Sequence, residues 1–320
     1  MKKYRWGFAG SGGISQRAVS EIARLEQAEV FAVSSRQQKK ADQFASQYGL
    51  KRAYDHFEKM CRDPEVDIIY IGTPNVYHKE QAILAMSCAK AVLCEKPLSV
   101  SVRDTQEMIT AAKNNSVFLM EGLWTRFIPV IRTVKEWIQA GAVGEILRID
   151  ASFCSQSALG PDSRVFSRKL GGGALLDLGV YPISVASFLI DRPVKKVSAR
   201  GIIGSTQVDV DAEVDLEFLG GTVAKIRCSL MQSSGESLSL YGTKGTIEIP
   251  FFWRAESAVH SHNSKIVRTV TGKASFEFEA QEVMRSLEQG ILESTVMPWA
   301  ASLQTAQIIE ESQRQLSLCR

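Results

Sequence analysis

The fold is decided by the stretch RWGFAGSGGIS at residues 5–15. A short strand-like run ends at Ala9, glycines follow, and the apolar spacing of a helix begins at Ile14. Glycines let the backbone turn tightly and approach a pyrophosphate, and the amino end of a helix supplies N–H donors with a partial positive charge. Placed between a strand and a helix, this turn predicts a dinucleotide-binding loop; a glycine-rich turn without a ligand is the alternative. Ser15 stands where Gly or Ala is usual, but it is small enough to keep helix and strand close. The loop residues expected to bind the cofactor are Gly10, Gly12, Gly13 and Ile14.

The end of the second predicted strand indicates which dinucleotide is bound. An Asp or Glu at this point would accept hydrogen bonds from the ribose 2′-hydroxyl of NAD. The chain has Ser34-Ser35-Arg36 here and no acid. Arg36 is suited to pair with a 2′-phosphate and Ser35 to donate a hydroxyl, and one charge-assisted hydrogen bond contributes roughly 1.5–3 kcal/mol. We therefore expect NADP as the cofactor; a solvated Arg at a helix start is the alternative.

Outward from this loop, the first part of the chain alternates strand-like and helix-like patterns. The predicted strands are residues 5–9, 30–34, 66–71, 91–94 and 117–121, and the predicted helices are 14–25, 38–48, 77–86 and 102–113. Repeated βα alternation with short apolar strands predicts a doubly wound parallel sheet with the Rossmann arrangement. We assign residues 1–122 to this NADP-binding domain.

The pattern changes after residue 122. The predicted helices are 129–140, 177–190 and 298–316, and the predicted strands are 146–153, 197–203, 210–218, 223–230, 237–241 and 246–249. Several of these strands alternate apolar and polar residues, which favours an antiparallel sheet with one open face. We therefore expect a second α/β domain over residues 123–320, whose last helix returns to the first domain.

Composition excludes several classes of protein. The net charge is +3, and the basic residues occur in no run longer than a pair, which does not fit a nucleic-acid interface. None of the six cysteines forms a C-x-x-C pair, so unpaired thiols in a reducing compartment are expected. The positive N-terminus leads into glycines rather than a signal sequence, and residues 180–190 are the best apolar stretch, short for a membrane span. We expect a cytoplasmic protein that binds neither nucleic acid nor membrane.

Two further motifs follow predicted strands at their carboxyl ends, where doubly wound sheets bind ligands. One is Thr73-Pro74-Asn75 with His78, and the other is Glu95-Lys96-Pro97. Lys96 is held between a strand end and a proline, so its ammonium is suited to polarise a substrate oxygen or to lower the pKa of a neighbour. A lysine in a loop, taken alone, is usually solvated.

Asp177 and Tyr181 lie four residues apart, a spacing that places both on one face of an α-helix. A tyrosine has an ordinary pKa of about 10, and a neighbouring ammonium would bring it into the range of a useful acid or base. Such pairs are common on helices, so the spacing alone is weak. Between these motifs, Phe153, Arg164 and Phe166 are either substrate contacts or packing residues, and we favour packing.

The remaining His and Trp residues offer no second site. His260 and His262 are predicted to lie in a polar loop without a carboxylate motif, and no metal site is expected. His56 is expected at the surface. The tryptophans expected to be packing residues are Trp6, Trp137, Trp253 and Trp299.

Together these residues resemble a known family, the Gfo/Idh/MocA oxidoreductases. The motifs that carry the resemblance are Gly10-x-Gly12, Ser35-Arg36, Thr73-Pro74-Asn75, His78, Glu95-Lys96-Pro97 and Asp177-x-x-x-Tyr181. The run from Met120 to Pro129 and Met297-Pro298-Trp299 are similar to the branch that contains dimeric dihydrodiol dehydrogenase and NADP-dependent D-xylose dehydrogenase. The resemblance implies a Rossmann domain followed by an α/β domain with a large, mainly antiparallel sheet, through which a homodimer is expected.

The resemblance also implies roles for individual residues. Lys96 corresponds to the lysine that contacts the reacting hydroxyl, Tyr181 to the acid/base, and Asp177 to a residue that orients the substrate or the base. Trp124, Arg126 and Phe127 correspond to residues near the nicotinamide and the substrate. The residues assigned to the cofactor beyond the glycine loop are Ser35, Arg36, Thr73, Pro74, Asn75, His78, Glu95, Lys96, Trp124 and Arg126.

These roles predict an NADP-dependent enzyme that moves a hydride between the nicotinamide and a CH–OH carbon. The substrate implied is a sugar, a polyol or a trans-dihydrodiol. One alternative is an NADP-binding sensor without catalysis, which has no need of both Lys96 and Tyr181. The other is a redox-assisted hydrolase or lyase with tightly bound NAD, which Arg36 disfavours.

Overall fold

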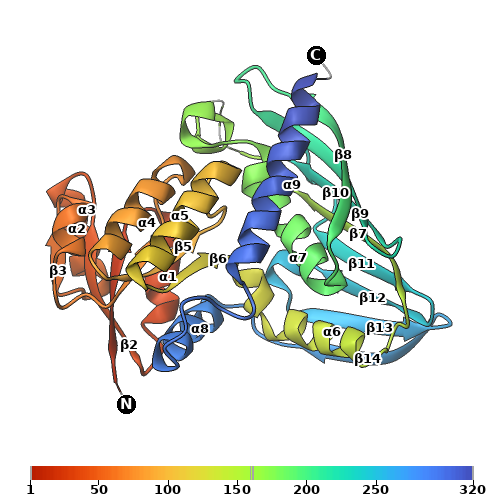
Figure 1. The fold of residues 1–320 in the computed structure, drawn as a ribbon, viewed down its shortest axis with the longest axis horizontal. Helices are drawn as coiled ribbons and strands as arrows, with labels where there is room; N and C mark the ends of the chain where they lie inside the picture. The colour runs from red at the N-terminus through yellow and green to blue at the C-terminus, as the bar shows by residue number, and fades with distance from the viewer. Residues whose placement is uncertain (1, 159, 161, 319–320) are drawn as a thin grey trace. The chain divides into compact units, whose positions relative to one another are not determined.

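The computed structural model describes residues 2–158, 160 and 162–318, and their arrangement is drawn in Figure 1. Two sheets are present. The strands of the first are β1 (Tyr4–Ala9), β2 (Ala28–Ser34), β3 (Arg52–Tyr54), β4 (Ile68–Ile71), β5 (Ala91–Glu95) and β6 (Leu119–Gly122). All neighbouring pairs in it are parallel, in the order β3-β2-β1-β4-β5-β6. This is the doubly wound Rossmann order, so the predicted fold of the first domain is confirmed.

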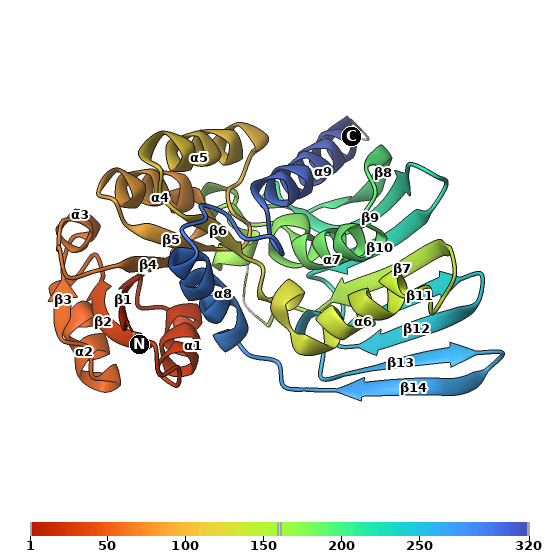
Figure 2. The ribbon, with the colours of Figure 1, turned by 60° about the horizontal axis from the view of Figure 1, so that its bottom comes forward.

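Hydrophobicity explains why these strands form the centre of the layer. Every residue of β4 and β5 is buried, as strands covered on both faces require. The helices are α1 (Gly13–Ile22), α2 (Gln38–Tyr48), α3 (Phe57–Cys61), α4 (His78–Ser87), α5 (Val102–Asn115) and α8 (Glu277–Glu288). Figure 2 shows α1 and α8 on one face of the sheet and α4 and α5 on the other. Ligands in such sheets bind where the strand order reverses, here between the ends of β1 and β4.

Three elements of this part were absent from the sequence prediction. Strand β3 and helix α3 are short, and neither has enough residues for a periodic signal. Helix α8 comes from far along the chain. The first compact unit is Met1–Trp124 together with Ser275–Leu303, whereas the boundary drawn from the sequence placed everything after residue 122 in the second domain. The return of this segment depends on long-range packing that local periodicity does not reveal.

The second sheet has eight strands in the order β14-β13-β12-β11-β7-β10-β9-β8. They are β7 (Ile146–Cys154), β8 (Val194–Ile203), β9 (Asp209–Phe218), β10 (Val223–Ser229), β11 (Ser237–Gly242), β12 (Gly245–Pro250), β13 (Ser257–His262) and β14 (Lys265–Thr271). Strands β7 and β10 pair in parallel and the other neighbours are antiparallel. The large, mainly antiparallel sheet is therefore confirmed.

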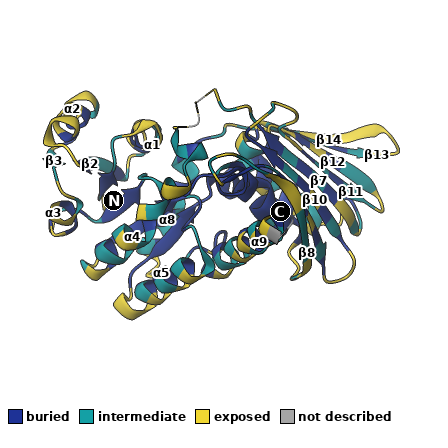
Figure 3. Cartoon of the chain, turned by 90° about the horizontal axis from the view of Figure 1, so that it is seen from above, coloured by how far each residue is buried: buried dark blue, intermediate teal, exposed yellow. Residues whose placement is uncertain are grey.

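Alternation along β9 divides the two faces of this sheet. Val210, Val214 and Phe218 are buried, while the acidic residues between them are not fully covered. Helices α6 (Pro129–Gln139) and α7 (Val180–Ile190) pack on the buried face, and α9 (Trp299–Leu318) is divided between the two units after Leu303. Strands β13 and β14 were not predicted from the sequence. Strand β14 gave no signal because it is an almost fully exposed edge strand with little apolar contrast (Figure 3).

One stretch, Arg168–Ile190, is long and apolar enough to cross a membrane by length and composition. It is longer than the predicted helix 177–190 because short helical turns precede α7. However, 89% of its most apolar window is buried inside the protein. This burial is typical of a core helix, which meets the same criteria of length and composition.

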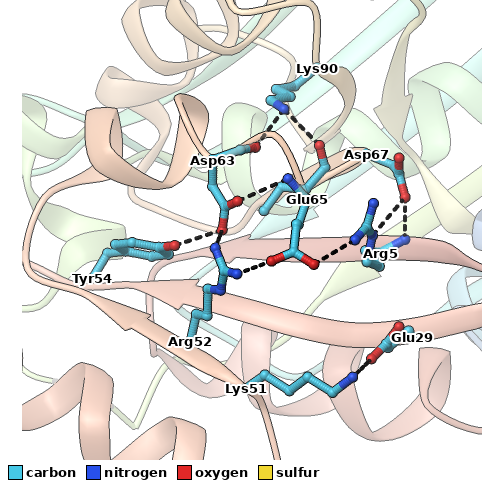
Figure 4. A network of polar contacts seen from close by, with 10 residues as sticks. Arg5, Glu29, Lys51, Arg52, Tyr54, Asp63, Glu65, Asp67 and Lys90 are labelled. Carbon is cyan, nitrogen blue, oxygen red and sulfur yellow. Dashed lines mark hydrogen bonds and ion pairs between the residues drawn. The ribbon is translucent and has the colours of Figure 1, made fainter.

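An ion-pair network closes one edge of the parallel sheet (Figure 4). Arg52 at β3 pairs with Asp63 at 2.7 Å and with Glu65, and Glu65 also accepts from Arg5 of β1 at 2.9 Å. The ammonium of Lys90 donates to the backbone carbonyls of Asp63 and Val66 at 2.7 and 2.8 Å. The network ties the loop before β4 to its neighbouring strands, so its role is structural.

Candidate active site

The glycine-rich loop forms one wall of a pocket of about 430 Å³ in the first unit. Gly10 connects β1 to α1 with φ of +96°, a conformation that favours glycine. Of the residues assigned to the cofactor from sequence, those lining this pocket are Gly10, Gly12, Ser35, Arg36, Thr73 and Pro74. Gly13 and Ile14 lie in the first turn of α1. Backbone donors, a helix terminus and cations around one cavity fit a dinucleotide phosphate.

Two cations line the part of the pocket that follows β2. Arg36 is joined there by Lys40 of α2, which the sequence analysis did not assign. Both side chains belong to exposed residues. Arg36 precedes α2 and Lys40 lies in its first turn, so no helical spacing relates the two residues and the sequence held no clear signal for Lys40. Asn75 and His78 are not among the residues that line this pocket.

His78 connects the loop that carries Thr73 to the loop that carries Pro97. It is completely buried at the start of α4, with Nδ1 2.9 Å from the carbonyl oxygen of Pro97 and Nε2 2.9 Å from that of Thr73. Asn75 is also buried. His78 therefore holds the loop after β4 to the loop after β5, and its direct contact with a cofactor stays a prediction.

Glu95 ends β5 and is almost fully buried. Its Oε1 accepts the Tyr70 hydroxyl at 2.5 Å, and its Oε2 accepts the backbone N–H of Lys96 at 3.3 Å. Burial raises the pKa of the Glu95 carboxyl, and the Tyr70 hydrogen bond and the Lys96 ammonium act in the opposite direction. Lys96 itself is half-buried. Glu95 thus positions the backbone of Lys96 rather than presenting a free carboxylate.

Trp124 and Arg126 have different surroundings. Trp124 belongs to the first unit, where its ring lies 4.4 Å from the guanidinium of Arg17. Arg126 belongs to the second unit, is buried, and donates to the Ser184 hydroxyl and carbonyl, both at 2.8 Å. Arg126 therefore anchors α7, and its assignment to the cofactor stays a prediction, as does that of Trp124.

Asp177 and Tyr181 lie in the second unit, on the continuous helix that leads into α7. Leu175–Gly179 is a π-helical turn, so the expectation of ordinary α-helical spacing was wrong for Asp177. Hydrogen bonds in a π-turn run from residue i to i+5, which changes the direction of each side chain relative to an α-helix. Tyr181 follows in the first turn of α7 and is 8% exposed.

Arg164 forms an ion pair with Asp177, with Nη2 2.7 Å from Oδ1. The sequence analysis favoured a packing role for Arg164, whereas in the structure its guanidinium is the ion-pair partner of Asp177. The start of the helix is fixed from the other side by Asp209 of β9, whose Oδ2 accepts the N–H of Leu175 at 2.6 Å. Gly173 allows this approach, because a Cβ there would lie 2.5 Å from Asp209 Oδ1.

An aromatic wall adjoins Tyr181. The rings of Phe153 and Trp253 stack at 5.0 Å with an angle of 13°, and their centroids lie 5.5 and 6.3 Å from that of Tyr181. Trp253 is half-buried and donates its Nε1–H to Glu236 at 2.8 Å. Trp253 was expected to be a packing residue only, whereas it is half-buried and stacks on Phe153 beside the tyrosine.

The other tryptophan and histidine residues named in the sequence analysis lie outside this cluster. Trp6 and Trp299 are buried, and Trp299 donates to the Leu119 carbonyl at 2.9 Å. His260 and His262 do not lie in a loop, as expected, but on β13, because alternate residues of this strand face the core. His260 is buried near Trp137. The described part of the chain contains no group of three or more His, Cys, Asp or Glu side chains able to hold a metal.

The parallel sheet, the glycine loop and the pocket beside it define a dinucleotide-dependent oxidoreductase. The profile of an oxidoreductase family with an NAD-binding Rossmann fold, Gfo/Idh/MocA, matches residues 4–123, and that of the C-terminal domain of this family matches residues 131–248. The chain belongs to the Gfo/Idh/MocA oxidoreductase family.

Curated relatives are similar over nearly the whole chain. The trans-1,2-dihydrobenzene-1,2-diol dehydrogenases of Danio rerio and Mus musculus are 33% and 32% identical, over 98% of this chain and 97% of theirs. These relatives confirm the prediction of an enzyme of the dehydrogenase class. Among solved structures, an aldose-aldose oxidoreductase from Caulobacter crescentus has a TM-score of 0.92 at 23% identity, covering 100% of this chain and 99% of that one. A levoglucosan dehydrogenase has a TM-score of 0.89 at 20% identity, covering 99% and 98%. At these identities the structures establish the fold.

Proposed function

We propose that this enzyme is an NADP-dependent dehydrogenase that transfers a hydride between the nicotinamide and the CH–OH carbon of a cyclic diol, a sugar or a polyol. The observation that carries the proposal is the similarity of more than 30% to dihydrodiol dehydrogenases over almost the whole chain. NADP, when bound, supplies the hydride acceptor. The chain supplies orientation and a route for the proton.

The choice of NADP rests on the two cations of the pocket. Arg36 and Lys40 line the cavity after β2, and the end of that strand has no carboxylate to accept a ribose hydroxyl. A 2′-phosphate placed between two cations gains charge-assisted hydrogen bonds that a hydroxyl does not make. Solved structures of the fold include complexes with either cofactor, a 3-ketoreductase from Actinomadura kijaniata with NADP and the levoglucosan dehydrogenase with NADH, so the choice of NADP depends on the two cations.

Proton transfer is assigned to Tyr181. Its hydroxyl would take the proton of the substrate hydroxyl as the carbon is oxidised, and return it in the reverse direction. Lys96 would hold a substrate oxygen, and Asp177, held by Arg164, would orient the substrate or the tyrosine. The half-buried ring of Trp253, supported by Phe153, suits the flat or apolar face of a ring-shaped substrate.

The open face of the antiparallel sheet suits a homodimer. Along β9 the outward residues are acidic, and they pair with basic residues of the two neighbouring strands: Lys195 with Glu217 at 3.0 Å, Arg227 with Asp211 at 3.4 Å, and Arg200 with Glu213. Such internal neutralisation allows two identical faces to approach each other. Sedimentation of the purified protein tests this assignment. We also propose a cytoplasmic location, which the free state of the described cysteines supports.

The decisive experiment follows NADP⁺ reduction by absorbance across cyclic trans-diols, aldoses and polyols. Turnover on one class identifies the substrate, and Tyr181→Phe should lose most of it while still binding NADPH. Arg36→Ala and Lys40→Ala should weaken NADPH binding more than NADH binding, by about tenfold or more for each lost contact. Lys39→Ala, exposed on the same helix, is the matched control. Equal losses for both cofactors would exclude the phosphate contact.

A further inference from the structure

Glu279 is a buried carboxyl whose presence packing does not explain. It is 1% exposed, and neither of its carboxyl oxygens accepts a hydrogen bond from the residues that the structure describes. Burying a polar group without a partner costs free energy, and an apolar side chain of similar size would avoid that cost. A residue of this kind points to a role beyond stability.

The start of α8 is held on α1 by a hydrogen bond to the backbone and by a cation–π contact. The carboxylate of Glu21 accepts the backbone N–H of Phe276 at 2.6 Å. The guanidinium of Arg17 lies 4.3 Å from the ring of Phe276 and 4.4 Å from that of Trp124. Arg17 also donates to Glu21 at 2.8 Å. These contacts fix the segment that carries Glu279 against α1 within the first unit.

They bring its carboxyl to the end of the parallel sheet that carries the Glu-Lys-Pro motif. A Cβ on Gly122, the last residue of β6, would lie 3.6 Å from Glu279 Oε2 and 3.5 Å from the Cα of Glu95. The Glu279 carboxyl and the backbone of Glu95 therefore both border the space where Gly122 has no side chain, and the charge of Glu95 acts on the Glu279 carboxyl. The other charged or titratable groups around them are Tyr70 of β4, Arg17 and Glu21 of α1, and Lys96.

Two neighbouring carboxyls in such a place do not both ionise. Glu95 has the donors that stabilise a negative charge, namely the Tyr70 hydroxyl at 2.5 Å and the Lys96 N–H. Glu279 has neither, and Arg17 is bound to Glu21. Burial raises the pKa of Glu279 well above its ordinary value, and the charge of Glu95 raises it further. The proton therefore belongs on Glu279 and the charge on Glu95.

We propose that Glu279 is a positioning residue, which shares one proton with Glu95 so that this carboxyl–carboxylate pair holds the Glu-Lys-Pro loop and keeps Lys96 in place. Glu279 donates its O–H to the Glu95 carboxylate, no bond to carbon changes, and a single negative charge remains beside the Lys96 ammonium. The inference rests on the proposed function only where it assigns Lys96 to the substrate.

The test compares two substitutions of Glu279 in the full chain. Glu279→Gln keeps the size and an N–H donor, so we expect kcat within about threefold of the unchanged protein. Glu279→Leu fills the space without a donor, and kcat should fall about ten- to hundredfold, since small displacements of a catalytic group have effects of this size. The KM for NADP⁺ should change little in both, and NADPH binding verifies that each variant is folded. Equal kcat values for the two variants would mean that Glu279 only fills space and would overturn the proposal.

A second readout does not need turnover. In the infrared spectrum at neutral pH, the protein should show the carbonyl band of a buried protonated carboxyl, and both Glu279 variants should lose it. Glu288→Gln, at the exposed end of α8, should keep it. If the unchanged protein has no such band, the shared proton is refuted. If the band is present but no substrate of the panel is oxidised, the proposed reaction fails while the shared proton is supported.

Discussion

Arg164 and Asp177 are joined by an ion pair of 2.7 Å within the second unit, between a short turn and a π-helical turn. Their side chains are 38% and 14% exposed, so the pair is only partly shielded from water. Its contribution to folding is accordingly small, of the order of 1 kcal/mol or less. The pair fixes the direction of the Asp177 carboxylate, which precedes Tyr181 by four residues in the chain.

Arg164→Gln should therefore affect catalysis more than stability. Loss of the guanidinium leaves Asp177 free to rotate, and we expect kcat/KM for the substrate to fall about tenfold, with a melting temperature within a few degrees of the unchanged protein. Arg168→Gln is the control on the same segment. An unchanged kcat/KM in Arg164→Gln would contradict the role given to the pair.

Asp209→Ala should destabilise the second unit. The Asp209 carboxylate accepts the N–H of Leu175 and is also hydrogen-bonded to Ala174 and Gln313, so its removal leaves buried donors without partners. Loss of such a cap costs about 1–3 kcal/mol, which thermal unfolding detects as a fall of several degrees. Asp209→Asn keeps an acceptor and should recover part of the loss. Equal melting temperatures for Asp209→Ala and the unchanged protein would show that the cap is dispensable.

The first domain could be predicted well from sequence because its signals are local. The apolar strand before Gly10, the helix after it and the arginine after the second strand all act on close neighbours in the chain. Both sheets followed from periodicity for the same reason. Strand β14 escaped because an exposed edge needs no apolar face.

The interior of the site depends on contacts between distant segments, which sequence patterns do not contain. Trp253 is separated from Phe153 by much of the second sheet, yet their rings stack. Glu279 reaches Glu95 only because its helix returns to the first unit. The π-turn at Asp177 has no recognisable signal, since its residues are ordinary helix formers apart from Gly179.

Glu279→Gln should make the protein more stable, increasingly so as the pH rises. The folded protein holds the pKa of Glu279 above that of the unfolded chain, so its contribution is complete below the unfolded pKa of about 4.3 and is lost as the pH rises through the folded pKa. The difference in unfolding free energy between the variant and the unchanged protein should grow by about 1.4 kcal/mol per pH unit within this window. Denaturant unfolding at pH 5, 6.5 and 8 measures it. Glu288→Gln should show no comparable trend, and a difference independent of pH would mean that Glu279 ionises as it does in water.

His78→Leu should weaken cofactor binding without touching the cofactor pocket directly. The imidazole is buried and its two nitrogens face the carbonyl oxygens of Thr73 and Pro97, so leucine of similar bulk removes the connection between the two loops. Each lost hydrogen bond costs about 1–3 kcal/mol where a buried partner is left unpaired, and part of this should appear as a tenfold or greater rise in the dissociation constant of NADPH. Fluorescence titration with NADPH and with NADH measures the effect, which should be similar for both because the substitution leaves Arg36 and Lys40 in place. His262→Leu, at an exposed position of β13 in the second unit, is the control. If His78→Leu binds both cofactors as tightly as the unchanged protein, the two loops are held by other contacts and the histidine only fills the interior.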